Sequence, residues 1–416
     1  MATIRQVTIT PVAFRDPALL NRVGVHEPFA LRSVIEVDCG DGVIGLGESY
    51  GDDAFLGLLR AVAPTLVGLD VFDLEIVARR VTAAVGPGTV TDNHGLTGTS
   101  SAAKTLRSVF SAFEVACLDA VGQLTGRPVV DLLGGRVREH VPFSAYLFYK
   151  WAGHPAAAPD EWGAALDADA IVRQAHRMIS RYGFGSIKLK GGVLPPDEEF
   201  EAIQALAGAF PHHPLRWDPN AAWTVPTAIR IADKAAGILE YLEDPTAGIA
   251  GMAQVAREAP MPLATNMCVV GFEDIPEAVD ARAIGVLLSD HHFWGGLRQT
   301  QYVAAVADTF DIGLSMHSNS HLGISLAAMV HVAASTPRLT YACDTHWPWK
   351  TEDVVAEPLE IVGGAVAVPR TPGLGVRLDR DALARLHQQY LTCGVRRRDD
   401  TGYMRRIRPD YRPGSW

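Results

Sequence analysis

The chain contains few cysteines, and they form no pattern. Its 416 residues include five, and none belongs to a CxxC pair or a zinc-type spacing: Cys39, Cys117, Cys268, Cys343 and Cys393. This argues against a disulfide-rich secreted scaffold and against a cysteine zinc site. We therefore expect a cytoplasmic protein.

Long apolar runs and an excess of positive charge are also absent. No apolar run approaches the length of about 18 residues that suggests a membrane helix. The opening stretch MATIRQVTIT lacks the basic and apolar regions of a signal peptide. The formal net charge of −10 argues against nucleic acid or an anionic membrane as the main partner. We expect a small-molecule partner and a homo-oligomer.

What the chain does contain is a regular alternation of strand-like and helical segments after residue 140. The expected strands are 143–149, 186–190, 215–218, 239–243, 262–266, 285–290, 312–317 and 340–344. From the second onward, their ends are 23 to 28 residues apart, which fits one strand, one crossover helix and two loops. Eight such units predict a (β/α)8 barrel of the TIM type more than a doubly wound sheet.

The remaining chain predicts additional structure at both ends of this barrel. Residues 1–138 contain strand-like runs, an Asp41-Gly42 hairpin signal and two helical regions, which indicates an α+β domain. Residues 139–353 form the expected barrel domain. Residues 354–416 return to strand-like alternation and end in an Arg-rich segment. We expect this C-terminal segment to pack on the first domain.

The stretch FGSIKLKGG, residues 184–192, places Lys188 and Lys190 on the same face of an expected strand. On its own, the stretch could be an edge strand protected by lysine. In a barrel, however, catalytic groups occupy the carboxyl ends of strands. Seven successive strands here end in polar groups: Lys188 and Lys190, Asp218, Glu243, Asn266, Asp290, His317 and Asp344. Helix capping explains a single aspartate well, but not all seven ends.

Three of these strand ends form a candidate metal site. Asp218, Glu243 and Asn266 end consecutive strands and should converge. Two carboxylates and a neutral amide suit Mg²⁺, which binds oxygen ligands and keeps positions for substrate. Because only two ligands are charged, an anionic substrate would meet no excess of negative charge.

The other polar strand ends suggest proton-transfer chemistry. Asp290 and His317 end adjacent strands, as expected of a histidine acid/base with an orienting carboxylate. Across the barrel, Lys188 would favour the uncharged form of Lys190, which could then act as a base. Removal of a proton next to a metal-bound carboxylate gives an enediolate, which the metal and Lys188 would stabilise.

The motifs KLKGG, WDPNAAW, LEDP, LATNM, SDHHFWGG, HSNSHLGISLA and CDTHW resemble the enolase superfamily, and within it the glucarate dehydratase group of acid-sugar dehydratases. The resemblance covers most of the chain, most strongly residues 184–350. It implies a modified barrel with an N-terminal capping domain that the C-terminal tail completes. It also implies Mg²⁺ and the dehydration of D-glucarate or L-idarate to 5-dehydro-4-deoxy-D-glucarate.

Further residues are implied by this resemblance alone. It suggests substrate contacts at His26, Tyr146, Lys188, Asn220, Asn319, His346 and Arg398. Residues 96–108, LTGTSSAAKTLRS, depart from the pattern of the family, so the hydroxyl contact expected there could be Thr99 or Ser100.

Several alternatives remain open at this point. The same intermediate would serve a dehydratase of another acid sugar, or a racemase or epimerase with opposed lysine and histidine bases. A metal-dependent hydrolase would call for a His-x-His pair near the first barrel strand, and FSAYLFYK contains none. A noncatalytic member would bind metal without turnover, but every expected catalytic position is filled.

Overall fold

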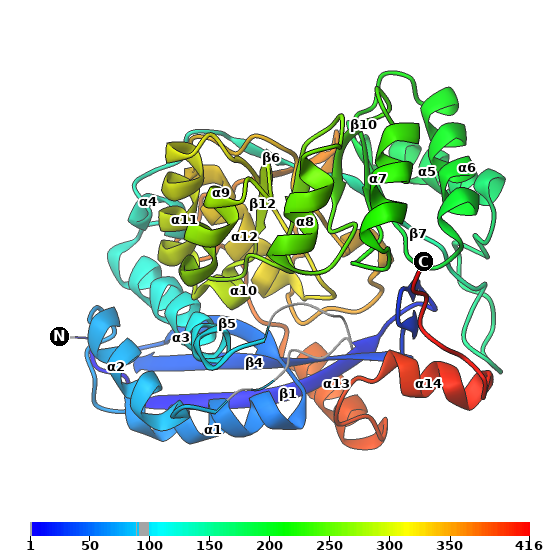
Figure 1. Ribbon diagram of the computed structural model, residues 1–416. Helices are drawn as coiled ribbons and strands as arrows, with labels where there is room; N and C mark the ends of the chain where they lie inside the picture. The colour runs from blue at the N-terminus through cyan, green and yellow to red at the C-terminus, as the bar shows by residue number, and fades with distance from the viewer. Residues whose placement is uncertain (1, 89, 91–99) are drawn as a thin grey trace.

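Seven parallel strands, arranged in the order of the sequence, form the wall of the barrel in the computed structural model (Figure 1). The structure describes residues 2–88, 90 and 100–416. The strands are β7 (Ala145–Phe148), β8 (Ile187–Lys190), β9 (Leu215–Asp218), β10 (Leu239–Glu243), β11 (Leu263–Thr265), β12 (Val286–Ser289) and β13 (Gly313–Met316). Every residue of β8, β9 and β12 is buried, as expected for parallel strands covered on both faces.

Helices between the strands cover the outside of the barrel. They are α5 (Ala168–Tyr182), α6 (Pro196–Ala209), α7 (Val225–Lys234), α8 (Gly248–Ala256), α9 (Ile275–Asp280), α11 (Leu297–Thr309) and α12 (Gly323–Ser335). In α5, the side chain of Asp167 caps the first turn, and Ile171, Ala175 and Met178 form one buried face. Within the described residues, no helix combines the length and apolar composition of a membrane span.

The last expected strand, residues 340–344, closes the barrel but is not a regular strand. Cys343 forms an isolated bridge with the segment just before β7. The amides of Thr340 and Tyr341 both donate to the carbonyl oxygen of Leu314 on β13. Because two successive amides share one acceptor, the regular ladder is interrupted there. The prediction of an eighth regular strand was therefore wrong, whereas the predicted barrel type is confirmed.

A three-stranded antiparallel sheet with three helices forms the capping domain, which lies below the barrel in Figure 1. Its main elements are β1 (Gln6–Arg15), β4 (Phe29–Gly40), β5 (Val43–Tyr50), α1 (Asp53–Leu66), α2 (Leu74–Val85) and α3 (Ala102–Thr125). Three short elements, β2 (Leu20–Asn21), β3 (Gly24–Val25) and α4 (Val129–Leu132), complete it. Asp41 and Gly42 both have positive φ between β4 and β5, as the hairpin signal predicted.

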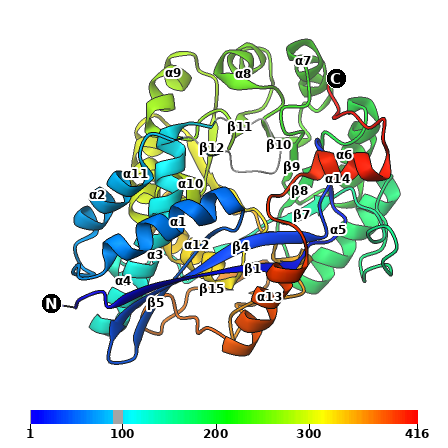
Figure 2. The same cartoon turned by 90° about the horizontal axis from the view of Figure 1, so that it is seen from below.

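The C-terminal segment contacts both parts of the molecule. It contains β14 (Ile361–Val362), β15 (Ala365–Ala367), α13 (Arg380–Thr392) and α14 (Asp400–Ile407). β15 pairs with β6 (His140–Pro142), while α13 packs on β1 and α14 on β3 (Figure 2). The tail thus completes the capping domain, as predicted. The boundaries at residues 138 and 353 and the homo-oligomer stay predictions.

Two glycines on β5 allow α3 to pack directly on the strand. A Cβ atom at Gly45 would collide with the backbone of Ala116, and one at Gly47 with that of Ala112. Because backbone atoms of a buried helix cannot swing aside, these positions have no room for a side chain. This close contact fixes the sheet beneath the helix that leads into the barrel.

We predict that Gly47→Ala destabilises the protein by about 1–3 kcal/mol, since the added methyl group overpacks a rigid contact. The matched control is Gly57→Ala on the exposed side of α1, where a Cβ meets nothing within 4 Å. Gly57→Ala should stabilise the protein by up to about 1 kcal/mol, because alanine has a higher helix propensity than glycine. Thermal unfolding followed by circular dichroism tests the order of the three midpoints. A midpoint for Gly47→Ala at or above the wild-type value would contradict the prediction.

Candidate active site

Lys188 and Lys190 point into the barrel. Their strand lies between β7 and β9, so the edge-strand alternative does not apply. The Nζ atom of Lys188 lies 2.6 Å from Asp344 Oδ2 and 2.5 Å from Glu243 Oε2. The Nζ atom of Lys190 lies 2.7 Å from Asp218 Oδ2. Both lysines are therefore held by carboxylates from other parts of the barrel wall.

The two lysines differ in their surroundings. Burial by itself would lower the pKa of Lys188, but the carboxylates of Asp344 and Glu243 outweigh burial and hold that pKa well above its usual value. Lys188 thus remains a fixed cation. Lys190 reaches a cavity at the mouth of the barrel. These environments are consistent with the predicted roles, in which Lys188 stabilises charge and Lys190 moves a proton.

The predicted metal ligands lie at the ends of three neighbouring strands. Asp218 and Glu243 end β9 and β10, and Asn266 directly follows β11. The Nζ atom of Lys188 lies 3.9 Å from Asp218 Oδ2 and 2.5 Å from Glu243 Oε2, so both carboxylates contact the same ammonium group. Asn266 Nδ2 donates to Glu243 Oε1 at 3.3 Å. The structure therefore brings the three side chains together, with an oxygen-rich donor set.

Buried carboxyl groups outnumber the buried lysines around these ligands. The four buried carboxylates near the two lysines are Asp218, Glu243, Asp244 and Asp344. Burial, reinforced by repulsion from Asp218, raises the pKa of Asp244 to about 7. Burial and the neighbouring carboxylates likewise raise the pKa of Glu243 well above its usual range, against the opposing effect of Lys188. A surplus of buried carboxylate oxygens fits a divalent cation such as Mg²⁺.

Asp290 and His317 form the predicted pair. Asp290 follows β12, His317 follows β13, and His317 Nδ1 lies 3.0 Å from Asp290 Oδ2. With Nδ1–H donated to the carboxylate, Nε2 remains for the cavity that His317 lines. Burial opposes ionisation of Asp290, but His292 and His317 outweigh it and hold the pKa of Asp290 well below its usual value. Asp290 can therefore balance a positive charge on His317.

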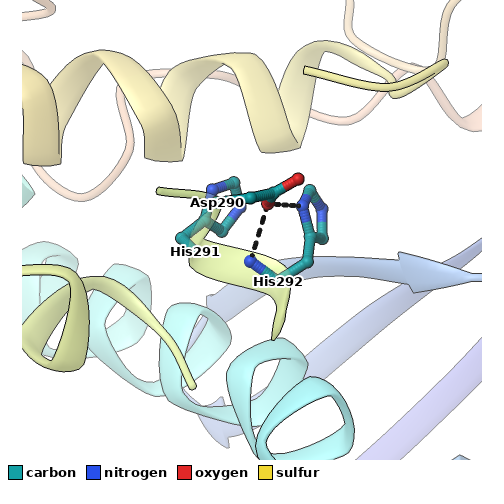
Figure 3. A group of neighbouring side chains, drawn as sticks. All are labelled: Asp290, His291 and His292. Carbon is teal, nitrogen blue, oxygen red and sulfur yellow. Dashed lines mark hydrogen bonds and ion pairs between the residues drawn. The ribbon is translucent and has the colours of Figure 1, made fainter. Parts of the chain in front are cut away.

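Asp290, His291 and His292 lie together at the start of α10 (His291–Trp294), as Figure 3 shows. Such a group could suggest a metal site. However, His292 Nδ1 lies 2.6 Å from Asp290 Oδ1, and Arg32 Nη2 lies 2.7 Å from His292 Nε2. Both ring nitrogens of His292 are engaged, and a guanidinium cation contacts the ring. This group is therefore a poor metal site.

The cavity lies between the barrel mouth and the capping domain, and eight of the predicted residues line it. They are Tyr146, Lys190, Asn266, His317, Asn319 and His346 from the barrel, His26 from the capping domain and Arg398 from the tail. Four other predicted residues do not line the cavity but contact residues that do: Lys188, Asp218, Glu243 and Asp290. The structure thus brings together residues that are far apart in the sequence.

Arg398 is held on two sides by carboxylates. Its Nε and Nη2 atoms donate to Asp400 at 2.8 and 3.0 Å, and its Nη1 atom donates to Asp16 Oδ2 at 3.2 Å. His26 Nδ1 lies 3.1 Å from the same oxygen of Asp16. Arg398 is therefore buried and oriented and is not part of a solvated basic run. Its guanidinium has more N–H groups than these contacts use, so it can still bind an anion.

Two predicted contacts have a different outcome. Asn220 is not among the cavity-lining residues; its Nδ2 atom donates to Asp218 Oδ1 at 2.8 Å and so orients a predicted metal ligand. Its role as a substrate contact stays a prediction. Thr99 lies outside the described residues, and the alternative Ser100 is half-buried and does not line the described cavity.

Other cavity residues were not identified from the sequence. They are Asn21, Tyr50, Lys104, Phe148, Met267, Phe293, Ser318 and Ser320. Ser318 and Ser320 flank Asn319 in the HSNSH motif, so their place in the cavity could have been predicted from that motif. Lys104, at the start of α3, lies over the ring of Phe293 with 5.0 Å to its centroid. No local pattern marks Lys104, because its position depends on how the capping domain meets the barrel.

The geometry permits a specific kind of chemistry. Lys190 and His317 line the same cavity next to Asn266 of the oxygen-rich cluster. An amine and an imidazole can each accept or deliver a proton on a molecule bound between them. A cation in the cluster would draw charge from a carboxylate of that molecule.

Comparison with known proteins agrees with this arrangement. Residues 4–134 match the family described as mandelate racemase / muconate lactonizing enzyme, N-terminal domain, and residues 170–382 match the enolase C-terminal domain-like family. A probable glucarate dehydratase of Streptomyces coelicolor is 53% identical, covering 98% of this chain and 97% of the relative.

Two solved structures extend the comparison. An enolase from Thermobispora bispora, complexed with magnesium and formate, is 62% identical, with a TM-score of 0.98 over 100% of this chain and 99% of its own. An enolase from Pseudomonas fluorescens, with bound magnesium, potassium and tartrate, is 51% identical, with a TM-score of 0.95 over 99% and 98%. The chain therefore belongs to the enolase superfamily of enzymes.

Proposed function

We propose that this enzyme is a Mg²⁺-dependent acid-sugar dehydratase that converts D-glucarate, and also L-idarate, to 5-dehydro-4-deoxy-D-glucarate. The observation that carries this proposal is the presence of Lys190 and His317 in one cavity beside the oxygen-rich cluster. The similarity to a probable glucarate dehydratase over nearly the whole chain supports the substrate class. Magnesium in two structural relatives supports the metal.

Asp218, Glu243 and Asn266 would hold the metal ion, and the charge surplus described above supports this assignment. Bound Mg²⁺ would stabilise negative charge on the substrate carboxylate when the neighbouring proton leaves. Lys188, fixed between Asp344 and Glu243, would add a second positive charge at the same place. Asn220 would keep Asp218 in the orientation needed for binding.

Lys190 and His317 would carry the two proton transfers. The Nζ atom of Lys190 would accept the α-proton of the acid sugar. His317, protonated and balanced by Asp290, would deliver its Nε2 proton to the β-hydroxyl, which departs as water. The product is an enol that becomes the α-keto acid. The cavity residues His26, Asn319, His346 and Arg398 would orient the remainder of the substrate.

The same pair of bases would also support a second candidate function. If His317 returned a proton to the α-carbon instead of protonating the β-hydroxyl, the enzyme would be a racemase or epimerase. Two proton-transfer groups in one cavity are the observation that favours this alternative. A dehydratase acting on a different acid sugar is a further alternative.

Product analysis on a substrate panel separates these functions. The purified protein with Mg²⁺ would be incubated with diacid and monoacid sugars, and α-keto acid would be measured. We expect α-keto acid from D-glucarate and L-idarate. Epimerised acid sugar without α-keto acid would replace the dehydratase by the epimerase, and no reaction with any member of the panel would contradict both.

We predict that Lys190→Ala and His317→Asn each reduce kcat for dehydration by about 10²- to 10⁴-fold, because each removes one proton-transfer group. Steady-state kinetics measure the loss, and circular dichroism checks that both variants remain folded. The matched control for the lysine is Lys234→Ala on the exposed surface of α7. Near-normal turnover of every substrate epimer by Lys190→Ala would show that the base is a different residue.

We also predict that Arg398 recognises the carboxylate remote from the metal. Arg398→Lys keeps the charge that Asp16 and Asp400 need but loses the planar fork. The change should lower kcat/KM for a diacid by about 10-fold or more, as expected for a lost charge-assisted hydrogen bond. A matched monoacid, which lacks the remote carboxylate, should be affected by less than about threefold. Equal losses on the two substrates would mean that Arg398 supports the fold instead.

A further inference from the structure

A chain of buried polar side chains runs from the capping sheet to His317. Glu48 on β5 accepts a hydrogen bond from Arg32 Nε on β4 at 2.7 Å. Arg32 Nη2 lies 2.7 Å from His292 Nε2, and His292 Nδ1 lies 2.6 Å from Asp290 Oδ1. The other oxygen of Asp290 contacts His317 Nδ1 at 3.0 Å. Each neighbouring pair in this chain is within hydrogen-bond distance. Glu48, Arg32 and His292 have no part in the proton transfers proposed above.

The arginine determines which nitrogen of His292 carries the proton. A guanidinium group can only donate, so His292 Nε2 must accept from Arg32, and the Ser325 hydroxyl, 2.9 Å from the same nitrogen, must then donate to it as well. The ring proton is then on Nδ1, and it is donated to Asp290 Oδ1. A doubly protonated ring would place two donors 2.7 Å apart, which is repulsive. His292 is therefore a neutral donor to Asp290. The backbone amide of His292 also donates to Asp290 Oδ1, at 2.9 Å, so two hydrogen bonds hold the same oxygen.

The arginine is itself fixed by groups from the capping domain and the barrel. Glu48 also accepts from the amides of Leu322 and Ser325 at 2.9 Å each, next to the start of α12. Burial opposes the charge on Glu48, but the Arg32 guanidinium outweighs it and lowers the pKa of Glu48 to about 2. The Arg32 guanidinium also lies 5.1 Å from the centroid of the Tyr50 ring. Arg32 thus has little freedom to turn away from His292.

We propose that His292 and Arg32 are positioning residues for His317. Arg32 sets the tautomer of His292, and His292 holds Asp290 so that one carboxylate oxygen, and only that oxygen, is presented to His317. The inference rests on the proposed function insofar as His317 transfers a proton to or from an acid sugar. It gives the capping domain a part in catalysis that does not involve contact with substrate.

Other charged and titratable groups near this chain are compatible with it. His317 contacts Asp290, and His346 and Lys190 line the same cavity as His317. His292 faces Asp290, Arg32 and the neighbouring rings of His291 and His321. Burial lowers the pKa of His321 to about 3, so that ring is neutral near pH 7. Asp290 is thus the anion in contact with both His292 and His317.

Two substitutions of His292 separate its hydrogen bond to Asp290 at Nδ1 from its contacts with Arg32 and Ser325 at Nε2. His292→Asn places an amide N–H near the position of Nδ1, so it keeps the donor to Asp290. His292→Gln places its amide near Nε2, so it keeps the contact with Arg32 and loses the donor to Asp290. Both side chains are polar and uncharged, which makes them a matched pair.

We expect His292→Gln to lower kcat by about 10- to 100-fold with KM changed by less than about threefold, because His317 would be misplaced while the groups that bind substrate would keep their positions. With less hydrogen bonding to its carboxylate, Asp290 should hold a proton on His317 more strongly. The pH midpoint assigned to His317 should rise by about one unit. The conservative variant His292→Asn should recover most of both properties.

The midpoint of His317 can be measured without substrate. Diethyl pyrocarbonate modifies neutral imidazole, so the modification rate of His317, followed by peptide mass spectrometry over a range of pH, reports its protonation. Wild-type kcat and an unshifted midpoint for His292→Gln would overturn the proposal. Equal losses in the Gln and Asn variants with unshifted midpoints would also overturn it, since they indicate a purely structural role.

A measurement on the wild-type protein covers the case in which His292→Gln does not fold. Nitrogen-15 NMR of histidine-labelled protein should show His292 neutral, with its proton on Nδ1, between about pH 6 and 9. A proton on Nε2, or a charged ring, would overturn the proposal. Neither this experiment nor the chemical modification needs turnover, so failure of the inference is distinguishable from failure of the proposed dehydratase function.

Discussion

The balance of buried charge at the barrel mouth is the constraint on which the rest of the site depends. Asp218, Glu243 and Asp344 are fully buried, and isolated carboxylates in such a place would be strongly unfavourable. Two lysines from β8 offset part of this charge through direct ion pairs. The remaining surplus explains why an oxygen-rich metal site fits here, and why Lys188 is a fixed cation.

The capping domain and the tail, together with the barrel, form the cavity. Strand ends carry the proposed proton-transfer groups and metal ligands, whereas His26 and Arg398 come from outside the barrel and line the same cavity. The hydrogen bonds that Glu48 on β5 accepts from the amides of Leu322 and Ser325 at the start of α12 join the two parts. A substrate in the cavity would therefore be bound between the strand-end residues of the barrel and residues of the capping domain and the tail.

Much of the barrel and of the candidate site could be predicted from the periodicity of the sequence and from the polar residues at the expected strand ends. Regular spacing identified seven parallel strands, and the groups at their ends led to Lys190, Asp218, Glu243 and His317. The eighth strand could not be predicted correctly, because its irregularity comes from two amides sharing the Leu314 carbonyl. The contact of Arg32 with His292 was missed because it joins residues 260 positions apart and leaves no local pattern. Lys104 was missed for the same reason.

Isothermal titration of Mg²⁺ into the substrate-free protein tests the charge-balance explanation most directly. We expect one Mg²⁺ per chain for the wild type and for Glu198→Gln, which changes an exposed carboxylate on α6. Glu243→Gln should lose this binding, because it removes one of the two anionic ligands. Absence of Mg²⁺ binding to the wild type, or binding that Glu243→Gln leaves unchanged, would contradict the placement of the metal at the ends of β9, β10 and β11.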